Sequence, residues 1–317
     1  MPSGADAYVN YGWETIFGTA SETINKGFGH GVEITSVEKN NNLIRVYGLG
    51  ARNAGALVPG KFEGRINMEF EPTGTAWWIK SLLGSISSSG TEAPYTHTYT
   101  ELDSLPSFTI ENGIDLTTDA VITYLGCVIE EAKFTFEEGQ PAKVSLSILY
   151  ADEAKTTASI GSADTEIDSP WSFAECALEV PNATAIANTQ RAELTIKNNS
   201  MMIYGLGSRT ASTHVEGERE YTLVTTNYFD DAATYLEALY GSATAAGGTP
   251  SAVATCELNM TNAGAGALER RISVLLANGL VQSHDLPQKV NEALMETAEL
   301  YMRSCTSIIM VNGTAAV

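Results

Sequence analysis

The chain has 317 residues, and its 38 acidic and 18 basic residues give a formal net charge of -20 at pH 7. This length suits two units of about 150 residues each, and a hydrophobic fraction of 44% is ordinary for a globular protein. The charge excludes a nucleic-acid-binding surface of clustered lysines and arginines, because Arg270-Arg271 is the only adjacent basic pair in the sequence.

The sequence also gives no sign of a membrane segment or a metal site. No apolar run reaches the roughly 18 residues of a membrane helix, and the N-terminus lacks the pattern of a signal peptide. We therefore expect a chain made and kept in the cytoplasm of its host. The four cysteines are too widely spaced for metal binding, and reduced, mostly buried thiols are expected at Cys127, Cys176, Cys256 and Cys305.

Three elements are predicted in the first half of the chain. Residues 62–71 alternate apolar and charged side chains, which is typical of an antiparallel strand with one buried and one wet face. In residues 73–85, Trp77, Trp78, Leu82 and Leu83 recur at helical spacing before Gly84, and one tryptophan is expected to face the core while the other points away. Residues 132–150 predict a β-hairpin around an EEGQP turn.

The remaining segments are assigned by composition and by comparison with the first half. Residues 85–104 and 241–252 are rich in Ser, Thr and Gly, and we expect loops that reach solvent or a neighbouring subunit. Residues 155–170 are small, polar and acidic, and predict a linker. Residues 230–242 predict a second helix. The last forty residues have helical propensity, but the repeat described next favours a final hairpin.

An internal repeat is the strongest signal in the sequence. Residues 43–85 align without a gap with residues 200–242, at an offset of 157, and 13 of the 43 positions are identical. Unrelated segments of ordinary composition would match at about one position in sixteen. The heptamer VYGLGAR at 46–52 returns as IYGLGSR at 203–209. We interpret this as a tandem duplication.

The repeat predicts two domains, 1–160 and 161–317. The expected fold class is mainly β with one helix per domain, each domain being a small β-sandwich or barrel. The repeated Gly-Leu-Gly lacks the third glycine of a dinucleotide-binding loop, so its expected role is a structural turn. The candidate turn residues are Tyr47, Gly48, Gly50 and Arg52 in the first copy, and Tyr204, Gly205, Gly207 and Arg209 in the second.

No catalytic, cofactor-binding or metal-ligating constellation is found in the sequence. Its four histidines stand apart from one another and from any nucleophile, and the common hydrolase, protease and redox motifs are absent. Adjacent carboxylates such as Glu130-Glu131 point to opposite faces of a strand, so they are poor acid and base partners. We therefore expect a protein that is not an enzyme and needs no cofactor.

The order of these parts resembles the tail tube proteins of tailed viruses. The resemblance rests on NNNLIRVYGLGARNAGALVPGKFEGRINMEFEPTGTAWWIKSLLG, in which a glycine turn is followed by a strand announced by Gly-Lys and then by a helix. It covers residues 31–85 directly and 200–242 through the repeat. It implies a structural virion protein whose partners are further copies of itself and other tail proteins, namely the tape measure, tail tip and terminator.

Single-domain members of that family form hexameric rings stacked into a hollow tube, so a fused pair implies three chains per ring with pseudo-sixfold symmetry. DNA would pass through without specific binding, because an acidic lumen repels phosphate. The candidate lumen-facing residues are Glu63, Glu69, Glu71, Glu137 and Glu138. Two alternatives stay open: a tail-tip or hub ring of the same fold, and a duplicated β-sandwich binding module that uses Tyr95, Tyr99 and Trp171.

Overall fold

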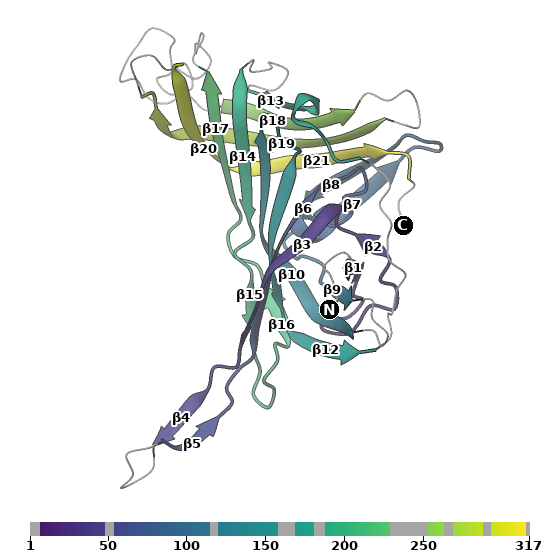
Figure 1. The fold of residues 1–317 in the computed structure, drawn as a ribbon, viewed down its shortest axis with the longest axis vertical. Coiled ribbons are helices and arrows are strands. Elements are labelled where there is room, and N and C mark those ends of the chain that lie inside the picture. The colour runs from purple at the N-terminus through teal and green to yellow at the C-terminus, as the bar shows by residue number, and fades with distance from the viewer. Residues whose placement is uncertain are drawn as a thin grey trace.

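The computed structural model describes residues 7–47, 54–114, 120–157, 169–180, 188–228, 253–262, 269–287 and 293–314. Within these ranges the chain is mainly antiparallel β-structure with one short α-helix and one 3-10 helix (Figure 1). The mainly β class predicted from the sequence is therefore confirmed. The second predicted helix, at 230–242, and the predicted loop at 241–252 lie outside the described residues.

The first half of the chain supplies the helix and twelve strands. These are β1 (Ala7–Trp13), β2 (Lys26–Gly27), β3 (His30–Asn40), β4 (Ile44–Tyr47), β5 (Ala54–Val58), β6 (Glu63–Glu71), α1 (Ile79–Leu83), β7 (Gly84–Ser89), β8 (Tyr95–Glu101), β9 (Phe108–Ile114), β10 (Ala120–Glu137), β11 (Lys143–Tyr150) and β12 (Asp152–Thr156).

The second half supplies the 3-10 helix and the remaining strands. These are η2 (Phe173–Glu175), β13 (Cys176–Glu179), β14 (Thr189–Lys197), β15 (Met201–Ile203), β16 (Thr213–Val215), β17 (Glu220–Tyr228), β18 (Val253–Asn262), β19 (Arg270–Asp285), β20 (Met295–Met302) and β21 (Ser304–Asn312). The antiparallel pairing of β19 with β20 confirms the final hairpin that the repeat predicts and not the helix that propensity suggests.

One long antiparallel sheet runs through both halves of the chain. Its strand order is β3-β6-β11-β10-β14-β17-β20-β19. Side chains alternate along these strands between a buried apolar face and a wet polar face, as the period of two in residues 62–71 predicts. Figure 1 shows β14, β17 and β20 standing side by side, with the other sheets lying across them.

Two further sheets cover the apolar face of the long sheet. One has the order β2-β1-β9-β10-β12, and the other has the order β7-β8-β21-β19-β18-β13. The strands β10 and β19 belong to two sheets each, because both are long and change partners near a β-bulge. The bulges lie between Ile129 and Glu131 in β10 and between Val281 and Ser283 in β19.

The core lies between the long sheet and these covering sheets. The helix α1 ends at Gly84, whose φ of 116° is one that glycine adopts most readily. Trp78 contacts Phe70 and Phe134 edge-on or tilted, at ring centroid distances of 5.6 and 5.8 Å. Trp77 is also buried and packs against the ring of His97, so the expectation that one tryptophan points out of the core is wrong.

The segment 85–104 is not a loop. Strands β7 and β8 form a hairpin, and β8 pairs with β21 of the second half, where Tyr99 lies opposite Ile308. Alternate residues of β8 are buried, including His97, which contacts Ser88 and Asn312. The Ser- and Thr-rich composition was misleading because these small polar side chains alternate with the buried ones on a strand whose other face is wet.

The two halves repeat one pattern of strand pairing. The order β3-β6-β11-β10 in the first half corresponds to β14-β17-β20-β19 in the second. Lys39 lies opposite Gly64, and Ile196 lies opposite Tyr221, so both strands keep the sequence offset of 157. The hairpins β4–β5 and β15–β16 interrupt the two patterns at equivalent places. The boundary at residue 160 falls outside the described residues.

A ladder between β10 and β14 joins the halves within the long sheet. It runs from Glu131 opposite Lys197 to Glu137 opposite Arg191. The same seam contains the buried Asn198, whose amide donates to the carbonyls of Leu82 and Ile129 at 3.1 and 3.0 Å. We call the β10–β14 ladder the internal seam.

The thiols should resist alkylation in the folded protein. All four cysteines are free, and burial raises the pKa of Cys176 and Cys305 to about 12 and that of Cys127 well above its usual value. Because the thiolate is the reactive form, iodoacetamide at pH 8 should label none of them quickly in native protein and all four after unfolding. Mass spectrometry of the intact chain counts the labels in each state, and mass spectrometry of its peptides locates them. Rapid native labelling at Cys127 would contradict the buried position.

Candidate functional site

The wet face of the long sheet is a polar surface built by strands of both halves of the chain. Several of its basic side chains are held in ion pairs: Arg65 lies 2.5 Å from Glu130, Lys133 lies 2.8 Å from Glu193, and Lys197 lies 3.5 Å from Glu131. Arg191 shares the carboxylate of Glu193 at 2.9 Å. These cations are therefore matched by carboxylates of the same face, which lowers their attraction for an anion such as phosphate.

Four of the five predicted lumen-facing glutamates lie on this wet face. Glu63, Glu69 and Glu71 alternate with buried residues of β6, and Glu137 ends β10 on the same side as Lys133. Glu138 lies in the turn after β10, where its backbone N–H donates to the carbonyl of Gln190 at 2.9 Å. The alternation of the sequence was sufficient to group the first four on one face.

Glu63 has a second role at the root of the first hairpin. Its carboxylate accepts a hydrogen bond from the Asn42 amide at 2.7 Å and lies 2.5 Å from the Lys61 ammonium. The hydrogen bond from Lys61 is the main cause of a lowered pKa at Glu63, followed by that from Asn42. This carboxylate therefore stays ionised to a lower pH than an ordinary glutamate, and it ties the end of β3 to the start of β6.

Both hairpin roots are built from the same hydrogen bonds. Asn42, at φ 42°, donates its amide to the carbonyl of Lys61 at 3.2 Å, and Asn199, at φ 47°, donates its amide to the carbonyl of Glu218 at 2.7 Å. Gly60 donates its N–H to the Asn41 carbonyl, as Gly217 does to that of Asn198. A Cβ at Gly60 would lie 2.4 Å from the Asn42 carbonyl oxygen, so this position requires glycine.

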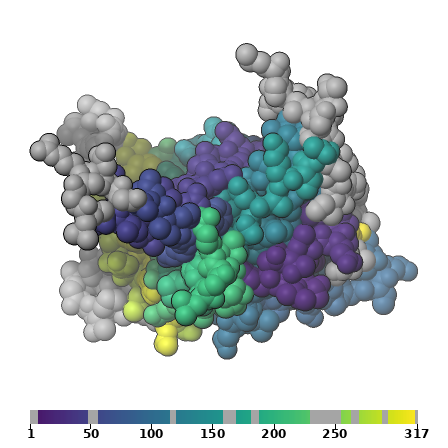
Figure 2. Space-filling model, turned by 90° about the horizontal axis from the view of Figure 1, so that it is seen from below, coloured from purple at the N-terminus to yellow at the C-terminus, as the bar shows by residue number. Residues whose placement is uncertain are grey.

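The second hairpin is packed against the root of the first. The Tyr204 hydroxyl donates to the carbonyl of Phe62 at 2.7 Å, and the Phe62 N–H donates to the carbonyl of Arg209 at 2.7 Å. The Arg209 guanidinium donates to the Gly60 carbonyl at 3.0 Å and to the Asn41 side chain at 2.7 Å. Figure 2 shows the green surface of this hairpin on the underside, beside the blue and purple surface of the first half.

The predicted turn residues of the second copy thus lie together, with Gly207 at φ 91° between Tyr204 and Arg209. In the first copy, Tyr47 is 88% exposed, whereas Gly48, Gly50 and Arg52 lie outside the described residues. The hairpin β4–β5 extends away from the rest of the chain as an arm (Figure 1). Its exposed apolar side chains are Leu43, Ile44, Val46, Leu57 and Val58.

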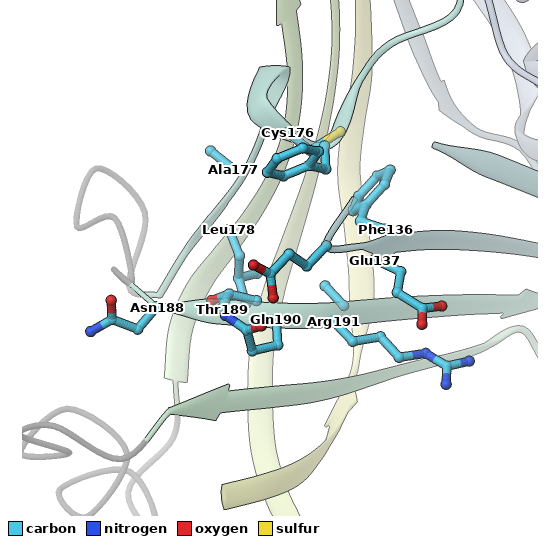
Figure 3. Close-up of a pocket in the computed structure, with 12 residues that line it drawn as sticks. Phe136, Glu137, Cys176, Ala177, Leu178, Asn188, Thr189, Gln190 and Arg191 are labelled. Atoms are coloured by element: carbon cyan, nitrogen blue, oxygen red, sulfur yellow. The ribbon is translucent and has the colours of Figure 1, made fainter. Parts of the chain in front are cut away.

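An open pocket of about 300 Å³ lies at one end of the internal seam. Figure 3 shows Phe136 and Glu137 from the end of β10, Cys176 and Leu178 from β13, and Arg191 from β14 around it. Its walls mix aromatic, aliphatic and charged groups, and the Cys176 thiol has the raised pKa described above. Among these lining residues, no nucleophile is in hydrogen-bond contact with a base.

The described residues contain no group of three or more His, Cys, Asp or Glu side chains that could hold a metal ion. In the same part of the chain no helix is long and apolar enough to cross a membrane. The aromatic residues proposed for a binding module are mostly inaccessible: Tyr99 and Trp171 are fully buried, and Tyr95 is partly buried. This burial removes the main support for a carbohydrate-binding module.

A comparison with family models gives one match of nearly full length. Residues 4–294 match the family described as phage tail tube protein. The chain belongs to the phage tail tube protein family. A search of curated proteins found no match. The family gives the chain a structural role in a phage tail tube, as the sequence resemblance implies, and the mainly β fold fits that role.

Membership in the tail tube family directs attention to surfaces through which copies of the chain meet. Sequence reasoning found the repeated turns and the glutamates of the wet face, but it missed the hairpin roots. The signal was present, because Asn41-Asn42 and Asn198-Asn199 occupy equivalent positions in the repeat. The hydrogen-bond geometry was needed to show that the first asparagine of each pair accepts through its carbonyl and the second donates through its side-chain amide to close each root.

Proposed function

We propose that the chain forms the hollow tail tube of a phage, as rings of three chains in which two copies of one duplicated unit give pseudo-sixfold symmetry. The observation that carries this proposal is the internal seam. Among the described residues, β3 at one end of the long sheet has no partner strand beyond β6, and the segment Leu280–Asp285 at the other end has none beyond β20. These two edges correspond to the two strands of the internal seam.

The correspondence extends to individual positions. The bulges of β10 and β19 lie 152 residues apart in the sequence, so Lys133 of β10 corresponds to Asp285 of β19. The offset of 157 relates Leu194 of β14 to Val37 of β3. If β19 of one chain pairs with β3 of the next in the register of the internal seam, both edges of the long sheet are covered throughout the ring, which removes the hazard that these open edges present. We call this contact the external seam.

The closed ring would place the wet face inside. The apolar face of the long sheet is covered by two more sheets and α1, and this second layer needs the larger outer circumference. Three chains with eight strands each, spaced about 4.8 Å apart, would give about 37 Å between opposing backbones before any tilt widens the ring. That space admits a DNA duplex.

The charge of the wet face supports a conduit in which DNA moves without being held. Glu69, Glu71 and Glu137 would face the channel, while Arg65, Lys133 and Lys197 are already paired with carboxylates. Binding to a DNA backbone requires unpaired cations that replace its counterions. We propose that the protein is structural and not catalytic, is assembled in the host cytoplasm, and meets tape measure, tail-tip and terminator proteins in the tail.

Negative-stain electron microscopy of the purified chain, concentrated at moderate salt, tests this proposal. We expect hollow tubes or stacked rings with three chains in each ring, with and without a tail-tip initiator added. Rings that never stack, even with the initiator, would support a tail-tip ring instead. A protein that stays monomeric under both conditions would contradict the tube.

A further inference from the structure

The contact between the two hairpins suggests where the exposed arm lies in an assembly. Within one chain, the second hairpin rests on the root of the first through Tyr204 and Arg209. The first hairpin has nearly the same turn sequence, YGLGAR against YGLGSR, but nothing in the described part of the chain covers Tyr47. The turn of the second repeat is docked, whereas Tyr47 of the first repeat is exposed. A docking surface for the first hairpin would therefore have to lie on another chain.

That surface is present at the root of the second hairpin. Arg219 takes the place of Phe62, and Gly217 takes the place of Gly60, with the same backbone bond to the preceding asparagine. No hydrogen bond among the described residues uses the main-chain carbonyl of Arg219, whereas that of Phe62 accepts the Tyr204 hydroxyl.

The side chain of Arg219 makes this root rigid. Its guanidinium donates to the Asn198 side chain at 2.7 Å and to the Leu102 carbonyl at 3.3 Å, and it lies 3.8 Å from the Glu101 carboxylate. Because these three contacts hold the guanidinium, the backbone of Arg219 has a fixed position. The root is therefore preorganised to accept a docked turn.

We propose that, in the ring, the arm β4–β5 docks on the root of the second hairpin of the neighbouring copy, with the Tyr47 hydroxyl donating to the main-chain carbonyl of Arg219. The proposal rests on the ring proposed above. The apolar residues of the arm, Leu43, Ile44, Val46, Leu57 and Val58, would then lose water against the neighbour. A second copy is the favoured occupant because the same turn already makes this contact within the chain.

One substitution makes the external contact weaker than the internal one. The Lys61 ammonium lies 5.2 Å from the Tyr204 ring centroid, a cation–π distance, and the corresponding residue of the second root is Glu218. A carboxylate gives Tyr47 no such attraction. The internal contact therefore forms with the fold, and the external contact forms when copies meet.

Photo-crosslinking tests the docking. The variant Tyr47→p-benzoylphenylalanine is prepared as a mixture of ordinary and nitrogen-15 chains and irradiated in dispersed and in assembled fractions. We expect mixed-isotope crosslinks from position 47 to residues 216–220 in the assembled fraction. The matched variant Tyr204→p-benzoylphenylalanine should crosslink within one chain to residues 60–62.

The outcomes distinguish a failure of the arm-docking proposal from a failure of the ring proposal. Assembled tubes that crosslink position 47 elsewhere overturn the arm docking and leave the ring standing. Crosslinked pairs to residues 216–220 without rings support the docking and overturn the ring. Absence of both overturns both proposals. As a second measurement, Tyr47→Phe should weaken association about fivefold at each contact, the effect of one net hydrogen bond, while Tyr204→Phe should lower the thermal stability of the single chain.

Discussion

The variant Val37→Asp is expected to remain a folded chain that no longer closes rings. Val37 is partly buried at the outer edge of β3, and its counterpart Leu194, covered by β10 across the internal seam, is fully buried. In the proposed ring, β19 of the next chain would cover Val37 in the same way. An unpaired carboxylate buried there costs about 3 kcal/mol or more, which is over about a hundredfold in the association constant of each seam.

Sedimentation velocity and electron microscopy measure the loss, and circular dichroism checks that the chain is folded. Thr222→Asp is the matched control, because it adds the same charge to the wet face of β17 away from either edge. Val37→Thr is a milder variant that keeps the shape of the side chain and should weaken assembly less. Tubes of normal length from folded Val37→Asp protein would show that β3 is not at a seam.

The same correspondence allows a change that strengthens assembly. In the internal seam, Lys133 and Glu193 form an ion pair of 2.8 Å, while the related positions of the external seam are Asp285 and Ser36. The double variant Ser36→Glu with Asp285→Lys should reproduce that pair between chains and increase association up to about fivefold per seam. The variant Ser36→Lys with Asp285→Lys places like charges together and should not. Equal effects of both would argue against the proposed register.

Tubes that carry Glu69→Lys, Glu71→Lys and Glu137→Lys together are expected to retain DNA inside. All three positions lie on the wet face, and the substitutions raise the formal charge by about six per chain, that is, by about 18 in a ring of three. Each new phosphate contact should steepen the fall of log K with log salt concentration by about 0.9. Wild-type tubes should hold no DNA under the same conditions.

Nuclease protection distinguishes the channel from the outer surface. Tubes are assembled with linear duplex DNA, treated with nuclease, and the surviving DNA is measured over a series of salt concentrations. The control variant Glu22→Lys, Glu92→Lys and Asp103→Lys has the same charge change at exposed positions away from the wet face. It should bind DNA that stays open to digestion. Protection by this control equal to that of the channel variant would place the lumen elsewhere.

The sequence alone was sufficient for the elements in which local pattern and long-range packing agree. Residues 62–71 and 132–150 alternate with a strict period of two because one face of each strand is buried and the other is wet, and both became strands of the long sheet. The glycine after the predicted helix became its cap at Gly84. The family resemblance followed from the order of such elements, and the family match over residues 4–294 confirms it.

Where small polar residues pack against another part of the chain, the sequence was misleading. Residues 85–104 were expected to be a loop, but pairing of β8 with β21, more than two hundred residues later, makes them a hairpin. One of the two adjacent tryptophans was expected to point outward, but both are buried, and the ring of His97 from that hairpin covers Trp77. Neither partner can be identified from local periodicity, because contacts across the halves depend on the complete fold.

The sequence by itself determined that the chain is acidic, mainly β and internally repeated, because charge, period and similarity are properties of residues in order. Only the tertiary structure decided that two hairpins with one turn sequence have different surroundings. Tyr204 is docked on Phe62, while Tyr47 is exposed on an arm. The physical reason is that the second turn has the root of the first within its own chain, whereas the first turn, at the end of the long sheet, has no such neighbour among the described residues.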